Sequence, residues 1–86
     1  MHKVWFDEAW EDYVFWLSQD KKTIKRINTL IKDIERNRLE GMGKPEPLKG
    51  DLAGFRSRRI DETNRIVYRF CGEVPEIISC RGHYSD

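Results

Sequence analysis

The chain has 86 residues, of which 16 are Lys or Arg and 15 are Asp or Glu, so its formal net charge is +1; 38% of its residues are hydrophobic and 12% aromatic. This length and apolar share predict one domain, residues 1–86, with a single core and no internal cofactor cavity, and they exclude an intrinsically disordered chain. The longest unbroken apolar run, residues 13–17, is far shorter than the roughly 20 residues that span a bilayer, so we expect a cytoplasmic protein with no membrane partner.

The first predicted elements are a short strand and an amphipathic helix. Residues 4–6 are β-prone and stop at Asp7, a residue type that favours helix N-caps. Acidic residues follow it, where the positive end of a helix dipole favours anions. Apolar residues then recur at helical spacing and predict a helix over residues 8–19: Ala9, Trp10, Tyr13, Val14 and Leu17.

A second helix is expected after a junction near Asp20, and the two helices should form an antiparallel hairpin. Its apolar stripe consists of Ile24, Ile27, Leu30, Ile31 and Ile34. Residues 1–20 contain five acidic residues and one lysine, whereas residues 21–38 contain seven basic residues and two acidic ones. The near-neutral total therefore conceals a basic middle, which is either an ordinary solvated helix face or a surface for nucleic acid.

A long connection separates the helices from a strand region. Residues 37–54 contain four glycines and two prolines, so we expect neither a helix nor a central strand there. Beyond it, alternating patterns predict three strands joined by turns, at residues 55–61, 65–71 and 76–81. In the middle strand, Ile66, Tyr68 and Phe70 share one face, and Arg65, Val67 and Arg69 share the other. The order β-α-α-β-β-β predicts an α+β fold, a helical hairpin packed on an antiparallel-rich twisted sheet.

The two cysteines and two histidines do not form a recognisable framework. A hairpin turn at residues 72–75 would place Cys71 near the turn and Cys80 several residues beyond it, so we expect free thiols. His2 and His83 are far apart, and no zinc-ligand spacing is present. We therefore expect no metal and no cofactor.

Arginines, one glutamate and one histidine are the candidates for chemistry. Six arginines lie in the strand half of the chain, where they serve either solubility or phosphate binding: Arg56, Arg58, Arg59, Arg65, Arg69 and Arg81. Glu46 lies between two prolines that restrict its backbone, and His83 lies near the end of the sequence; taken singly, each fits an exposed surface residue. Together these groups suffice to cleave RNA, because a base can activate the 2′-OH, an acid can protonate the leaving 5′-oxygen and a cation can stabilise the phosphorane charge.

Four segments carry a resemblance to a known family. Gly-Lys-Pro-Glu-Pro-Leu-Lys at 43–49, Ser-Arg-Arg-Ile at 57–60, Arg-Ile-Val-Tyr at 65–68 and the closing His-Tyr at 83–84 resemble the Txe/YoeB family of bacterial toxins. These are the toxin halves of type II toxin–antitoxin modules in the RelE/ParE superfamily. The similarity runs through nearly the whole chain and implies a small RelE-like fold.

The resemblance also implies a ribosome-dependent mRNA endonuclease, which enters the A site of the 70S ribosome, cleaves the mRNA there and inhibits translation. By motif, Glu46 would be the general base, His83 the general acid and Arg65 the cation at the transition state, while Tyr84 would position the substrate. The expected RNA-binding residues are Lys49, Arg59, Arg58 and Lys44. The implied partners are a cognate antitoxin, the ribosome with its rRNA and mRNA, and a second copy of the chain when free.

The sequence departs from the family pattern at a few positions, and two other functions fit part of it. Asn64 stands where a His is frequent, and Gly82 stands before His83 where a bulkier residue is common, so we expect altered efficiency or codon preference rather than lost activity. One alternative is a ParE-like toxin that inhibits DNA gyrase by protein contact, and another is a non-catalytic RNA-binding module. Neither alternative needs an acid–base pair, so Glu46 and His83 favour the nuclease.

Overall fold

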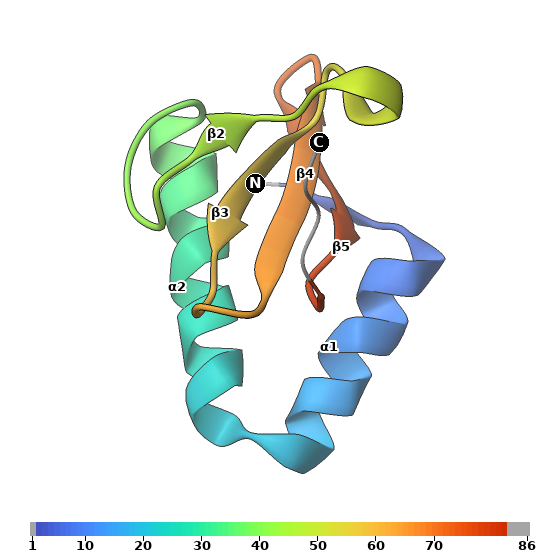
Figure 1. Ribbon diagram of the computed structural model, residues 1–86, viewed down its shortest axis with the longest axis vertical. Coiled ribbons are helices and arrows are strands. Elements are labelled where there is room, and N and C mark those ends of the chain that lie inside the picture. Colours follow the sequence, from blue (N-terminus) through green and yellow to red (C-terminus); the bar gives the residue numbers. More distant parts are fainter. Residues whose placement is uncertain (1, 83–86) are drawn as a thin grey trace.

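The computed structural model describes residues 2–82, in which two helices pack on one face of a five-stranded sheet (Figure 1). The helices and strands are β1 (Val4–Trp5), α1 (Asp7–Gln19), α2 (Lys21–Asn37), β2 (Glu46–Pro47), the 3₁₀ turn η1 (Gly50–Leu52), β3 (Arg56–Arg59), β4 (Arg65–Cys71) and β5 (Val74–Ser79). The strand order is β1-β5-β4-β3-β2, with β1 parallel to β5 and the other pairs antiparallel. The predicted α+β class and helical hairpin on an antiparallel-rich sheet are confirmed.

The helices meet at Asp20, as predicted, and diverge from there in a V (Figure 1). Asp20 caps α2, because its carboxylate accepts from the Lys22 backbone N–H at 3.0 Å and from the Thr23 hydroxyl at 2.9 Å. The expectation that Asp7 caps the first helix was wrong. Phe6 occupies the N-cap without a side-chain bond, and Asp7 begins the helix, where its charge still faces the helix dipole.

The core lies between the helices and the sheet. The apolar stripe of α2 supplies Ile27, Leu30 and Ile34, all fully buried, against Ile66 and Tyr68 of β4. This is the face of β4 on which alternation had placed the apolar residues. On the opposite face Arg65 and Val67 are also less than a tenth exposed, so β4 is buried on both sides.

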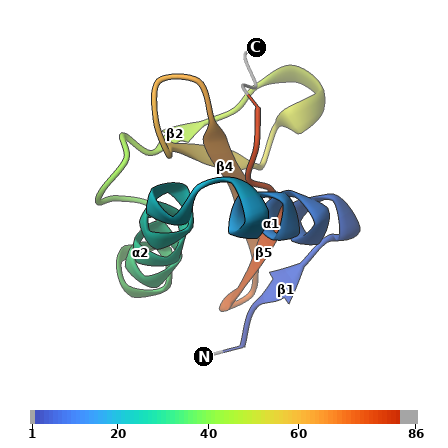
Figure 2. The same ribbon diagram turned by 90° about the horizontal axis from the view of Figure 1, so that it is seen from below.

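Of the three predicted strands only β4 has the predicted limits: β3 is shorter than predicted at both ends, Arg56–Arg59 in place of 55–61, and β5 is shifted, Val74–Ser79 in place of 76–81. β5 begins at Val74, because the turn needs only Gly72 and Glu73, and Pro75 pairs with Phe70 inside the strand. A proline is tolerated there because β1 pairs with β5 only from Glu76 onward. The long connection also contains a strand that was not predicted, β2, which pairs with β3 at the edge of the sheet. Seen from below, β2 and the 3₁₀ turn lie beyond β4, away from the helices (Figure 2).

Candidate active site

Glu46 and Arg65 meet on the sheet face that the helices leave uncovered. Glu46 pairs with Ser57 across β2 and β3, and Arg65 starts β4 on the other side of β3. Arg65 Nη1 donates to Glu46 Oε1 at 2.7 Å and to Ser57 Oγ at 3.2 Å. The Arg65 side chain is 9% exposed and the Glu46 side chain 53%, so the arginine is buried while the glutamate remains open to a ligand.

One hydrogen-bond donor of Arg65 has no partner among the described residues. This donor is Nε, which is buried. An unsatisfied donor of a charged group is costly to bury, and an anion at the site would relieve that cost. A carboxylate that can take a proton therefore lies beside a cation that can stabilise a phosphate.

The chain before His83 passes next to this pair. The backbone N–H of Arg65 donates to the Gly82 carbonyl at 2.9 Å. His83 and Tyr84, predicted as general acid and positioning residue, lie outside the described residues. Arg65 thus contacts the predicted base with its side chain and the start of the predicted acid segment with its backbone.

Three of the predicted RNA-binding residues are exposed, one opposite Arg65 on β3 and two on the segments that flank β2. Arg59 lies opposite Arg65 in the β3–β4 register and on the surface. Lys44 precedes Glu46 by two residues, and Lys49 precedes the 3₁₀ turn; both are exposed. Each cation can reach solvent, as a phosphate-binding residue must.

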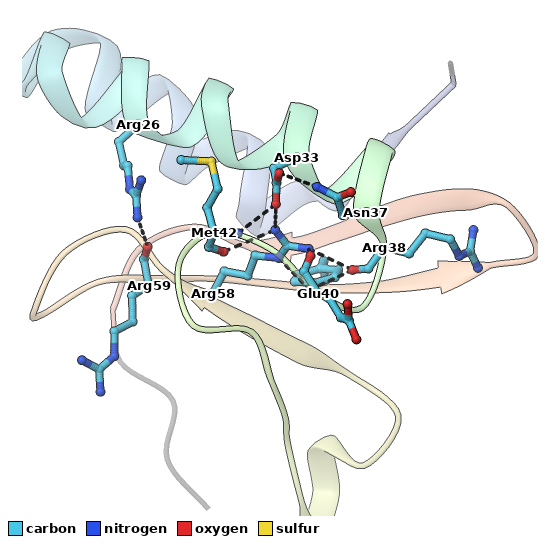
Figure 3. A network of polar contacts seen from close by, with 9 residues as sticks. Arg26, Asp33, Asn37, Arg38, Glu40, Met42, Arg58 and Arg59 are labelled. Carbon is cyan, nitrogen blue, oxygen red and sulfur yellow. Dashed lines mark hydrogen bonds and ion pairs between the residues drawn. The ribbon is translucent and has the colours of Figure 1, made fainter.

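Arg58 corrects the sequence-based expectation. Its side chain is fully buried, and each of its five N–H groups has an acceptor (Figure 3). Nη1 pairs with Asp33 of α2 and donates to the Met42 carbonyl, and Nε donates to the Tyr68 hydroxyl at 3.1 Å. Nη2 donates to the carbonyls of Arg38 and Glu40 at 3.0 and 2.7 Å. No donor is left for a phosphate, so Arg58 is a structural residue and not part of an RNA-binding surface.

The Arg58 network holds the loop that leads to Glu46. Asp33 also accepts from the Met42 backbone N–H at 3.0 Å. Burial acts to raise the pKa of Asp33, but the hydrogen bonds from Met42 and Arg58 outweigh it and lower that pKa. A Cβ added at Gly41 would lie 2.0 Å from Asp33 Oδ2, and one added at Gly43 would lie 2.9 Å from the Leu30 side chain. At Gly41 and Gly43 the loop therefore packs too tightly against its neighbours to accept a larger residue without a shift.

Two participants were not assigned roles from the sequence. Ser57 is fully buried and accepts from Arg65. The signal in the sequence is its place next to Arg58 on β3, since neighbouring residues of a strand face opposite sides of the sheet. Asn64 was noted only as a departure from the family pattern, yet its Oδ1 accepts from the Gly82 N–H. Neither role is visible without the register between strands.

The described residues contain no sign of a metal or membrane site. No group of three or more His, Cys, Asp or Glu side chains between residues 2 and 82 is placed to hold a metal ion. Within the same range, neither helix has the length and hydropathy to cross a bilayer. Cys71 and Cys80 are both free, as predicted. Burial, reinforced by the nearby charge of Asp12, raises the pKa of the Cys80 thiol to about 12, so this thiol is unreactive at neutral pH.

Comparison with known proteins places the chain among bacterial toxins. Residues 5–84 match the family model described as YoeB-like toxin of bacterial type II toxin-antitoxin system. Toxin YoeB of Escherichia coli (strain K12) is 50% identical over 84 residues, which cover 98% of this chain and all of that protein. Toxin YoeB of Streptomyces coelicolor is 51% identical over 84 residues with the same coverage.

Solved structures agree with this placement. The YoeB/ParE toxin from Agrobacterium tumefaciens has a TM-score of 0.94 at 48% identity, covering 98% of this chain and 100% of that one. YoeB in the heterotetrameric YoeB–YefM toxin–antitoxin complex from Staphylococcus aureus has a TM-score of 0.90 at 45% identity, with 98% of both chains covered. YafQ from E. coli (the H87Q mutant) has a TM-score of 0.81 at 14% identity over 96% of this chain and 94% of that one, which shows a shared fold alone.

Proposed function

Because the chain belongs to the YoeB-like toxin family of bacterial type II toxin–antitoxin systems, we propose that it is a ribosome-dependent mRNA endonuclease. The observation that carries the proposal is the Glu46–Arg65 contact, in which an exposed carboxylate is held 2.7 Å from a buried guanidinium with a spare donor. A protein that only contacts gyrase has no use for such a pair.

The proposed reaction is an in-line transfer at a phosphodiester of mRNA in the ribosomal A site. Glu46 removes the proton of the 2′-OH, the 2′-oxygen forms a bond to phosphorus, and the bond from phosphorus to the 5′-oxygen breaks. His83 gives the leaving 5′-oxygen its proton. The products are a 2′,3′-cyclic phosphate and a 5′-hydroxyl end.

The cations of the site stabilise the transition state and bind the RNA. Arg65 faces the charge that develops on phosphorus, and the donation from its Nη1 to Ser57 keeps the guanidinium in place. Arg59, Lys49 and Lys44 lie at exposed positions and hold flanking phosphates or rRNA. Tyr84 positions the nucleotide beside the acid.

The proposed partners are an antitoxin and a second copy of the chain. The relatives from S. aureus are described as a YoeB–YefM complex and as a YoeB dimer. In this chain Trp10, Val14 and Leu17 lie at helical spacing on α1 and are about half exposed, at 53, 46 and 53%. Large apolar side chains gathered on one helix face favour a protein partner.

Overexpression followed by primer-extension mapping tests the function. A nuclease produces new 5′ ends at codons in the ribosomal A site while DNA supercoiling stays normal. A supercoiling defect with intact mRNA would support gyrase inhibition in place of cleavage, and binding of RNA with neither effect would support the non-catalytic module. Each of these two results would overturn the proposal.

A further inference from the structure

Gly82 is the last residue that the structure describes, three residues beyond the end of β5, and both of its backbone groups are hydrogen-bonded. Its N–H donates to Asn64 Oδ1 at 2.9 Å, and its carbonyl accepts from the Arg65 N–H at 2.9 Å. Because each peptide group is planar, these two bonds orient the peptide planes on both sides of the Gly82 Cα. The backbone conformation of Gly82 is therefore restrained by two adjacent residues, Asn64 and Arg65.

Asn64 is itself held rigidly in the turn between β3 and β4. Its Nδ2 donates to both carboxylate oxygens of Asp61, at 3.2 Å each, which leaves its Oδ1 to accept from Gly82. Asp61 Oδ1 also accepts from the backbone N–H groups of Thr63 and Asn64, at 2.8 and 2.6 Å. The carbonyl of Asn64 in turn accepts from the Ile60 N–H at 2.9 Å. Side chain and backbone of Asn64 are thus both positioned before they meet Gly82.

Side-chain packing does not replace these bonds at Gly82. A Cβ added there would meet no heavy atom within 4 Å, and the φ of +93° lies in the region that favours glycine. A glycine in open space has wide conformational freedom unless hydrogen bonds restrict it. The bonds to Asn64 and Arg65 supply that restriction.

We propose that Asn64 is a positioning residue for the general acid, acting through its hydrogen bond to the N–H of Gly82. The proposal rests on the proposed nuclease function, in which His83, the next residue in the chain, protonates the leaving 5′-oxygen. Arg65 completes the arrangement, because its side chain contacts Glu46 while its backbone N–H holds Gly82.

The N64A variant removes the acceptor for Gly82 and should slow cleavage of ribosome-bound mRNA by about 10-fold or more, since misplacing a catalytic group by about 1 Å can cost 10²-fold. The matched control is T63A, in the same turn, because Thr63 contacts Asp61 through its backbone N–H, which the substitution keeps. A second variant, N64D/D61N, exchanges the two side chains, so that position 64 keeps an oxygen that can accept from Gly82 and position 61 supplies the amide donor that position 64 loses. It should therefore retain several-fold more activity than N64A.

A substrate with sulfur in place of the bridging 5′-oxygen separates positioning from a general structural defect. A thiolate leaves without being protonated, so a defect confined to the acid disappears on this substrate. We expect N64A to be slow on the oxygen substrate and close to the unaltered protein on the sulfur substrate, as H83A should be, with T63A normal on both. Melting temperatures of the variants are measured alongside.

Several results would overturn the inference while leaving the proposed function intact. They are an N64A rate equal to that of the unaltered protein, an equal loss on both substrates, or an N64D/D61N variant no better than N64A. If the unaltered protein cleaves neither substrate on ribosomes, the proposed function itself fails, and the two failures are thus distinguishable.

Discussion

Arg58 and Arg65 are both buried arginines of the strand region, and their neighbours give them different roles. Arg58 has an acceptor for each N–H and belongs to the packing of the loop against α2. Arg65 retains a buried Nε without a partner among residues 2–82, beside an exposed carboxylate. Satisfied donors make Arg58 a structural residue, whereas the unpaired donor of Arg65 and the exposed carboxylate beside it make that pair the candidate site.

For Arg65 we predict that R65K lowers the cleavage rate on ribosomes by about 10²-fold or more. Lysine keeps the charge but has one donor nitrogen in place of the forked guanidinium, so an ammonium that takes the place of Nη1 against Glu46 and Ser57 leaves no second nitrogen for phosphate. The rate is measured under single-turnover conditions with saturating protein. A variant within a few-fold of the unaltered protein would show that charge alone is enough and that the fork is unimportant.

For Arg58 we predict that R58M costs about 3–5 kcal/mol of unfolding free energy, because it leaves Asp33 and several loop carbonyls without their donor. R59A is the matched control on the neighbouring, exposed position, and it should change stability by less than about 0.5 kcal/mol. Urea denaturation of both variants gives the comparison. Equal stabilities would contradict the role assigned to the Arg58 network.

At the scale of elements, the loop before β2 is held by close packing against α2. We predict that G43A destabilises the protein by about 1–3 kcal/mol more than G50A, since overpacking adds to backbone strain. Both glycines have positive φ, +80° and +64°, so backbone strain affects both variants. Only at Gly43 would the Cβ also meet Leu30 and the Arg59 carbonyl, whereas at Gly50 it meets nothing within 4 Å. Thermal or urea unfolding measures the difference, and equal losses would contradict the close approach.

The elements themselves were predictable to different degrees. β4 was predicted with its observed limits, because alternation over residues 65–71 is a local signal. β2 was missed because it exists only through pairing with β3, in a segment whose prolines and glycines argue against a strand. Likewise, alternation separated Arg58 from Arg59 but could not tell which face would be buried. The acceptors that satisfy Arg58 are mostly loop carbonyls, and backbone groups leave no trace in the residue pattern.

The site was predictable where the motif was specific and not where it depended on register. Glu46 and Arg65 came from the family resemblance, and the structure brings them into contact. Asn64 and Ser57 act through cross-strand neighbours, and a single sequence carries no information on those pairings. The assignment of Arg58 to RNA failed for the same reason.

At the scale of the whole molecule, hydrogen-bonded carboxylates determine the response to acid. The pKa values of Asp33 and Asp61 are lowered, because hydrogen bonds to each carboxylate outweigh the effect of burial. A carboxyl with a lower pKa in the folded state stabilises the fold above its unfolded pKa of about 4, and that stabilisation is lost as the pH falls through the folded value. Burial raises the pKa of Asp12, which therefore acts in the opposite direction.

We therefore predict that the melting temperature falls as the pH is lowered from about 5 to 2, and that D61N flattens this dependence. Asparagine at position 61 keeps an acceptor for the turn but has no proton to bind in this range. Calorimetry across the pH series of both proteins gives the slopes. If D61N showed the same pH dependence as the unaltered chain, Asp61 would not contribute to it.

If Glu46 acts as a base on mRNA beside Arg65, the E46Q variant must lose the cleavage step. Glutamine keeps the size of the side chain and an oxygen for the Arg65 donor, but it cannot take the 2′-OH proton. Single-turnover cleavage of mRNA on 70S ribosomes is measured with the unaltered protein and with E46Q, and the chemistry of the new ends is determined. The unaltered protein should produce 2′,3′-cyclic phosphate ends, and E46Q should cleave at a rate at least about 10²-fold lower. Cleavage by E46Q at the full rate, or ends of another chemistry, would contradict the role of Glu46 as the base.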